Sequence, residues 1–150
     1  MIKIISFVDS YKHFDKSIKE YEKRLGKSVN FQKLKPVKST NPDEIIKKES
    51  LILNKILEKT SGYKVLLYID SEELSTQKFE KFIEEKQVKY SDIVFIIGGA
   101  YGVDLEIIKN NIDFKLSFSP MTFPHIMAIL ILLEQIYRAK KIKEGGNYHH

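Results

Sequence analysis

Continuous runs of apolar residues alternate with helix-forming segments along this chain, and that alternation constrains the fold more than any other feature. Residues 65–69 and 93–97 are unbroken apolar runs of strand length. Strands of this kind are buried on both faces, which is typical of parallel sheets with helices on either side. The sequence therefore predicts an α/β fold with a mostly parallel sheet. Its 150 residues are expected to form one domain, spanning 1–150.

The expected elements follow from apolar spacing and from helix start and stop signals. Asp9 or Ser10 is expected to cap the first helix, and Asn41 and Ser75 the next two. Asp70 is expected to end the third strand, while the second helix should bury Ile45, Ile52 and Ile56. The expected strands are 3–8, 29–34 (near an edge), 65–69, 93–97 and 114–118, and the expected helices end at Leu25, Lys59, about Asn110 and Lys143.

Composition narrows the class of protein. The chain has no cysteine, which excludes disulfides and thiolate metal sites. It starts without a secretory h-region, and its longest apolar run, 126–133, is too short to cross a bilayer. We therefore expect a cytoplasmic protein with no membrane association and no metal. The net charge of +5 fits either a solvated basic surface or nucleic-acid binding, and charge alone leaves both open.

Three strand ends carry residues suited to a ligand site. Ligands of parallel sheets bind beyond the carboxyl ends of the strands, where this chain has Ile69-Asp70, the glycine-rich segment 98–102 and the segment 119–124. The glycine spacing is GGxxG, so the dinucleotide fingerprint GxGxxG is absent. Each segment also has a simpler interpretation: the glycines could form only a tight turn, and Thr122 could merely cap the last helix.

The last helix is apolar on nearly all sides between Ile126 and Leu133. One side of such a helix packs on its own sheet, and the other must also be covered. We expect a second copy of the chain to supply that cover in a homodimer. The alternative is that the helix is buried within one chain.

Several motifs together closely resemble the RlmH (YbeA) family of SPOUT-class methyltransferases. They are EYEKRLG at 20–26, FIIGGAYGVD at 95–104, LSFSPMTFPH at 116–125, LLEQIYRAKKI at 132–142 and NYH at 147–149. Their order and spacing match over essentially the whole chain. The resemblance implies a homodimer with a C-terminal trefoil knot and S-adenosylmethionine as methyl donor. The implied substrate is N3 of a pseudouridine in helix 69 of large-subunit (23S) rRNA, within the assembled 70S ribosome.

The resemblance also implies roles for individual residues. Cofactor contacts are implied for Ile69, Gly98, Ser119, Pro120, Met121, Thr122, Phe123 and Pro124, and contacts with substrate for His125, Glu134 and Arg138. Tyr148 and His149 are the implied catalytic residues. Family members usually follow this Tyr-His pair with lysine or arginine. This chain has His150 instead, so the constant positive charge that would contact a phosphate is missing.

Methyl transfer to a ring nitrogen requires loss of a proton. His149 is our hypothesis for the group that assists, with Tyr148 stacking on RNA, and water or an rRNA phosphate is the alternative base. Arg138 is expected to hold substrate, because arginine binds phosphate bidentately. Other functions stay open at this stage: a methyltransferase acting on tRNA, a non-catalytic ribosome-binding factor, or a nucleotide-binding enzyme of ordinary doubly wound topology.

Overall fold

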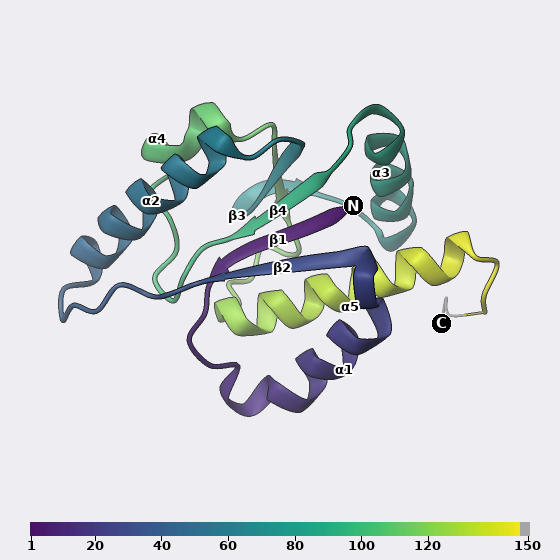
Figure 1. Cartoon of the computed structure of the whole chain (residues 1–150), viewed down its shortest axis with the longest axis horizontal. Helices are drawn as coiled ribbons and strands as arrows, with labels where there is room; N and C mark the ends of the chain where they lie inside the picture. The colour runs from purple at the N-terminus through teal and green to yellow at the C-terminus, as the bar shows by residue number, and fades with distance from the viewer. Residues whose placement is uncertain (148–150) are drawn as a thin grey trace.

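A single parallel sheet forms the centre of the computed structural model, which describes residues 1–147 (Figure 1). Within those residues the strand order is β2-β1-β4-β3-β5, and every neighbouring pair is parallel. This confirms the expected sheet, with β2 at an edge. The strands are β1 (Ile2–Phe7), β2 (Val29–Leu34), β3 (Tyr63–Glu73), β4 (Ile93–Ile97) and β5 (Phe114–Ser117).

Helices cover both faces of the sheet, as predicted (Figure 1). On one face lie α1 (Asp15–Leu25), α3 (Thr76–Lys89) and α5 (His125–Lys143), and on the other α2 (Pro42–Lys59) and α4 (Leu105–Ile108). Short 3-10 turns occur at Lys12–Phe14, Gly26–Ser28 and Lys109–Asn111. Each of the two faces therefore has its own hydrophobic core, and β4 between them is buried along its whole length.

Two of the three predicted helix caps are confirmed. The Asn41 side chain accepts from the backbone N–H of Asp43 at 3.0 Å, and Ser75 accepts from that of Lys78 at 3.2 Å. The predicted cap at Asp9 or Ser10 is wrong, because α1 begins later, at Asp15, without a side-chain cap. Lys12 has a φ of 50°, which breaks the helical path, and Ser10 Oγ instead accepts from the Lys12 N–H at 3.1 Å.

The inward face of α2 differs from the prediction at Ile52. That side chain is 42% exposed, while the stripe that packs inward runs through Ile45, Glu49, Leu53 and Leu57 at intervals of four. Ile56 is half-buried, flanking this stripe. The apolar spacing gave a wrong prediction for Ile52 because one of the buried positions of α2 is occupied by the carboxyl side chain of Glu49.

The prediction that Asp70 ends the third strand is also wrong. The strand continues to Glu73, but its register with β5 breaks between Leu67 and Glu72. Asp70 lies within this irregularity with a φ of 56°. Asp is among the residues that adopt this left-handed conformation most readily, so Asp70 marks a local distortion of the strand and not its end.

The apolar helix α5 packs between α1 and α3 on its face of the sheet. Its fully buried side chains include Ile129, Leu132 and Leu133, whereas Met127 and Ile131 are half-buried. The chain itself thus supplies part of the cover that we expected from a second copy. No helix within residues 1–147 is long and apolar enough to cross a membrane.

Candidate functional site

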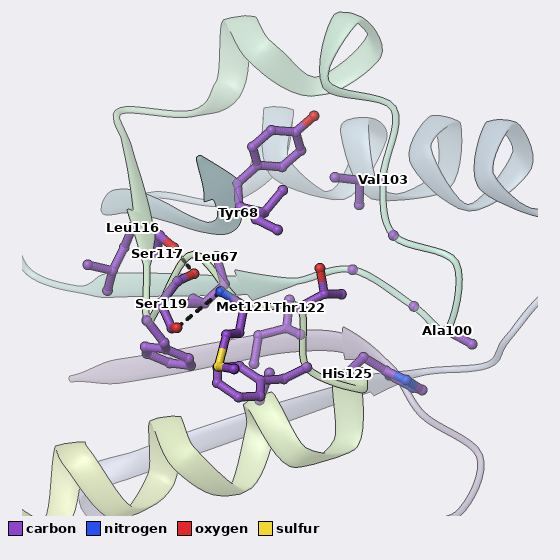
Figure 2. A pocket seen from close by; sticks show the side chains of 18 of the residues that line it. Leu67, Tyr68, Ala100, Val103, Leu116, Ser117, Ser119, Met121, Thr122 and His125 are labelled. Carbon is purple, nitrogen blue, oxygen red and sulfur yellow. Dashed lines mark hydrogen bonds between the residues drawn. The ribbon is translucent and has the colours of Figure 1, made fainter. Parts of the chain in front are cut away.

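A cavity of about 450 Å³ opens at the carboxyl edge of the sheet, where all three predicted segments meet (Figure 2). It is lined from β3 and its distortion, from the glycine-rich loop after β4, and from β5 with the loop before α5. Among the lining residues are Leu67, Tyr68, Ile69, Ile97, Gly98, Gly99, Tyr101, Val103, Leu116, Ser117, Phe118, Ser119, Met121, Thr122, Phe123 and His125. The three segments, at 67–69, 97–103 and 116–128, are separate in the sequence and together line one cavity.

The distortion of β3 places two residues at this cavity. Tyr68 and Ile69 lie between the two stretches of β3 that pair with β5, and both line the cavity. Ile69 is 40% exposed, whereas Val65 and Leu66 earlier in the strand are fully buried. The break in register therefore converts the end of a buried strand into a surface that a ligand can contact.

The glycine-rich loop is a tight turn and a cavity wall at once. The N–H of Gly102 donates to the carbonyl of Gly99 at 3.0 Å, and Gly102 has a φ of 87°, which favours glycine. At Gly98 a Cβ would approach the backbone carbon of Gly102 to 2.9 Å. The loop is thus compact enough to expose its backbone at the cavity.

The loop between β5 and α5 is shaped by its serines. Ser117 Oγ donates to the carbonyl of Ser119 at 2.8 Å, and Ser119 Oγ accepts from the N–H of Met121 at 3.1 Å (Figure 2). The interpretation of Thr122 as a helix cap is wrong, because α5 is preceded by Pro124 and has no side-chain cap. Thr122 lines the cavity instead.

His125 is the first residue of α5, and it lies at the cavity with a half-buried ring. Burial lowers the pKa of the imidazole below its ordinary value, and the nearby positive charge of Lys12 acts in the same direction. A hydrogen bond with the backbone of Phe7 opposes the shift without reversing it. The ring is therefore neutral at pH 7.

Glu134 and Arg138 are not among the residues that line the cavity. They form an ion pair one turn apart on α5, with side chains only 20% and 21% exposed. The Glu134 carboxylate also accepts from Gln135 at 2.7 Å, and Gln135 in turn accepts from Thr76 at 3.0 Å. This network fixes the pair on the surface of α5 beside α3.

The structure thus brings together most of the predicted cofactor residues, and it separates others. Ile69, Gly98, Ser119, Met121, Thr122, Phe123 and the substrate residue His125 line one cavity. Pro120 and Pro124 belong to the same loop but do not line it. Tyr148 and His149 lie outside the described residues. Sequence reasoning missed Tyr68 and Val103, while Tyr101 lay within the glycine segment already noted as a candidate.

A family model described as "Predicted SPOUT methyltransferase" matches residues 1–149. The chain belongs to the SPOUT methyltransferase family. This membership agrees with the parallel sheet and with a cavity built from the loops at its carboxyl edge.

Several sequence relatives of this SPOUT family member are named "Ribosomal RNA large subunit methyltransferase H". The protein of that name from Fusobacterium nucleatum is 40% identical over 142 residues, covering 92% of this chain and 91% of the relative. The one from Mycoplasmopsis pulmonis is 38% identical over 151 residues, covering 99% and 98%. The similarity to these relatives therefore extends over nearly the full length of both proteins.

Solved structures are similar to this SPOUT family member in fold. A Bacillus anthracis protein, provisionally assigned as an RNA methyltransferase, superposes with a TM-score of 0.58 at 16% identity, covering 94% of this chain and 95% of that one. A provisionally assigned methyltransferase from Legionella pneumophila, solved with bound SAM, gives 0.57 at 13% identity, covering 93% and 66%. At these identities the likeness concerns the fold alone.

Proposed function

We propose that this protein is an S-adenosylmethionine-dependent methyltransferase that acts on large-subunit rRNA. The observation that carries the proposal is the meeting of Ile69, Gly98 and the loop from Ser119 around one cavity. The names of the full-length relatives support the class of substrate. All of residues 1–150 would form one methyltransferase domain.

The residues of the cavity suit S-adenosylmethionine. The volume of about 450 Å³ is ordinary for a site that takes a small ligand. Apolar side chains such as Leu116 and Phe123 can flank a flat ring, and the exposed backbone of the glycine loop supplies hydrogen-bond partners. Among residues 1–147, those that line the cavity include no lysine or arginine, and His125 is neutral at pH 7. These described residues therefore place no fixed positive charge beside a cationic sulfonium.

When bound, S-adenosylmethionine supplies an electrophilic methyl group on a sulfonium. The chain's own residues would orient both reactants and exclude water from them. The Ser117 and Ser119 hydrogen bonds hold the loop that would wrap the donor. His125 would face the substrate as a neutral ring, while Glu134 and Arg138 would contact RNA outside the cavity, with Arg138 on phosphate.

The finer details of our proposal rest on the family resemblance, including its match at Tyr148 and His149. The target would be N3 of a pseudouridine in helix 69 of 23S rRNA, on the assembled 70S ribosome. His149 would take the N3 proton or position the base, and Tyr148 would stack on the RNA. Pro120 and Pro124 would set the course of the cofactor loop. The active form would be a knotted homodimer that pairs along α5.

Transfer of labelled methyl groups from S-adenosylmethionine tests this function. Purified protein is incubated with 70S ribosomes, with protein-free rRNA, or with tRNA. We expect incorporation into the large-subunit rRNA of intact ribosomes and little into the two free RNAs, since a chain of this size needs a preassembled surface to recognise its target. Incorporation into tRNA alone would contradict the proposed substrate, and calorimetry that detects no S-adenosylmethionine binding would contradict the proposed chemistry.

A further inference from the structure

Glu49 is a buried carboxyl group for which the proposed reaction has no role. Its residue is only 2% exposed, in the inward stripe of α2. Its Oε2 accepts a hydrogen bond from the Val37 N–H at 3.0 Å, whereas Oε1 has no hydrogen-bond partner among residues 1–147. Burial raises the pKa of this carboxyl group. An incompletely satisfied buried carboxyl is costly, so its presence calls for an explanation.

The free oxygen of Glu49 lies directly against the glycine loop. A Cβ built on Gly99 would overlap Glu49 Oε1 and approach its Cδ to 3.3 Å. Gly99 lines the cavity, but Glu49 does not. The carboxyl group therefore contacts the loop from outside the cavity.

The backbone conformation of Gly99 does not require glycine. It is absent from the positive-φ glycines of the described chain, so its backbone conformation is one that any residue can adopt. The remaining neighbour of the built Cβ is Phe7 Cβ, at an ordinary contact distance of 3.4 Å. Close contact with Glu49, whose other oxygen accepts from the Val37 N–H, is thus the feature of the described chain that opposes a side chain at position 99.

Two further buried hydroxyls hold the loop on either side of this contact. Ser6 Oγ donates to the carbonyl of Gly98 at 3.3 Å, and Ser50 Oγ accepts from the N–H of Asp104 at 2.9 Å. Both serines are no more than 1% exposed. Hydrogen bonds from β1 and α2 therefore hold the loop at Gly98 and Asp104. Glu49 contacts the loop between these two residues, at Gly99.

We propose that Glu49 is a positioning residue for the cofactor cavity: its carboxyl group, anchored by the Val37 amide, holds the Gly99 backbone at the place where the cavity wall must be. This inference rests on the proposed binding of S-adenosylmethionine. It predicts that a side chain at position 99 would press against Glu49, displace the cavity wall and so weaken binding. Glu49 itself would not contact the ligand.

A double-mutant cycle tests this contact. Gly99→Ala should weaken binding of S-adenosylmethionine about tenfold, measured by calorimetry, because the new methyl group and the anchored carboxyl cannot both be accommodated. In the background of Glu49→Ala, adding Gly99→Ala should change the affinity by no more than about twofold. Thermal unfolding of each variant separates loss of binding from loss of folding. Glu49→Asp, which is shorter by one methylene group, replaces Glu49→Ala in the cycle if the alanine variant does not fold.

Gly102→Ala is the matched control. Gly102 lies in the same loop with nothing within 4 Å of a built Cβ, but its φ of 87° strains any other residue. Shortening Glu49 should therefore not relieve the effect of Gly102→Ala. In addition, Glu49→Gln keeps the shape and the acceptor for Val37, so its affinity should stay within about twofold of wild type.

The proposal is overturned if Gly99→Ala binds S-adenosylmethionine like wild type. Because the carboxyl group is proposed to hold the wall, Glu49→Ala alone should also weaken binding. The proposal is equally overturned if Glu49→Ala alone binds S-adenosylmethionine like wild type, or if Gly99→Ala weakens binding by the same factor whether or not Glu49 has been shortened. An NMR spectrum adds a readout away from the cavity, since Gly99→Ala should shift the amide resonance of Val37. Failure of the wild-type protein to bind S-adenosylmethionine would instead overturn the proposed function itself.

Discussion

The Arg138 guanidinium donates twice to one oxygen of Glu134, from Nε at 3.0 Å and from Nη2 at 2.6 Å. The pair is largely shielded from solvent and lies on α5 outside the cavity lining. We propose that this guanidinium holds phosphate of the RNA substrate. The cofactor and RNA contacts are thus expected on different parts of the molecule.

Arg138→Ala should lower affinity for ribosomes about tenfold and leave affinity for S-adenosylmethionine unchanged. One charge-assisted contact is worth roughly 1.5–3 kcal/mol, which is at least a tenfold effect. Ribosome pelleting and calorimetry measure the two affinities. Arg24→Ala is the control, because Arg24 forms a similar pair with Glu20 on α1. Loss of cofactor binding in Arg138→Ala would show that the assignment to substrate is wrong.

Ser119→Ala should weaken binding of S-adenosylmethionine roughly three- to tenfold. The variant loses the acceptor for the Met121 N–H, and one such hydrogen bond contributes about 0.5–1.5 kcal/mol to holding the loop. Calorimetry gives the affinity. Ser28→Ala removes a hydroxyl bonded to the Leu25 carbonyl away from the cavity, and it should bind normally. Equal affinities in both variants would exclude Ser119 from shaping the site.

Acidification should destabilise the protein through His125. Its pKa is below 6.5 in the folded chain and close to that ordinary value in the unfolded chain, so the unfolded state takes up the proton first. The free energy of unfolding should therefore fall as the pH drops below about 6.5, and this component should disappear in His125→Gln. Denaturant titrations between pH 5 and 8 measure it. The same slope in wild type and variant would contradict the assignment, and His13→Gln, at an exposed position, serves as the control.

Ile131→Asp should convert a dimer into a monomer. Ile131 is half-buried on α5, where we propose that two copies pair, and a carboxylate there would have to be desolvated in the interface. Sedimentation equilibrium gives the oligomeric state. Leu51→Asp introduces the same charge at an exposed apolar position of α2 and should remain dimeric. A monomeric wild type would refute the proposed pairing.

Sequence periodicity predicted the strands and most of the helix limits, because buried parallel strands and capped helices have strong local signals. Asn41 and Ser75 were found this way. The start of α1 was not, since the left-handed conformation of Lys12 has no signal in its residue type. The burial of Glu49 was also unpredictable, because charged residues are normally assigned to the surface.

The site was only partly accessible from sequence. Strand ends and glycines indicated the three segments, and the family resemblance selected residues within them. The cavity wall from Tyr68 depends on the broken register of β3 beside β5, which is a property of two strands together. The support under Gly99 likewise depends on a contact across 50 residues of sequence. Neither follows from local pattern.

Mapping of methylated nucleotides in 23S rRNA tests the central claim most directly. Ribosomes from cells that lack this protein are compared before and after treatment with the purified protein and S-adenosylmethionine. We predict that one pseudouridine in helix 69 gains a single methyl group at N3. Large-subunit rRNA that stays unmodified, although the protein binds the methyl donor, would contradict the account.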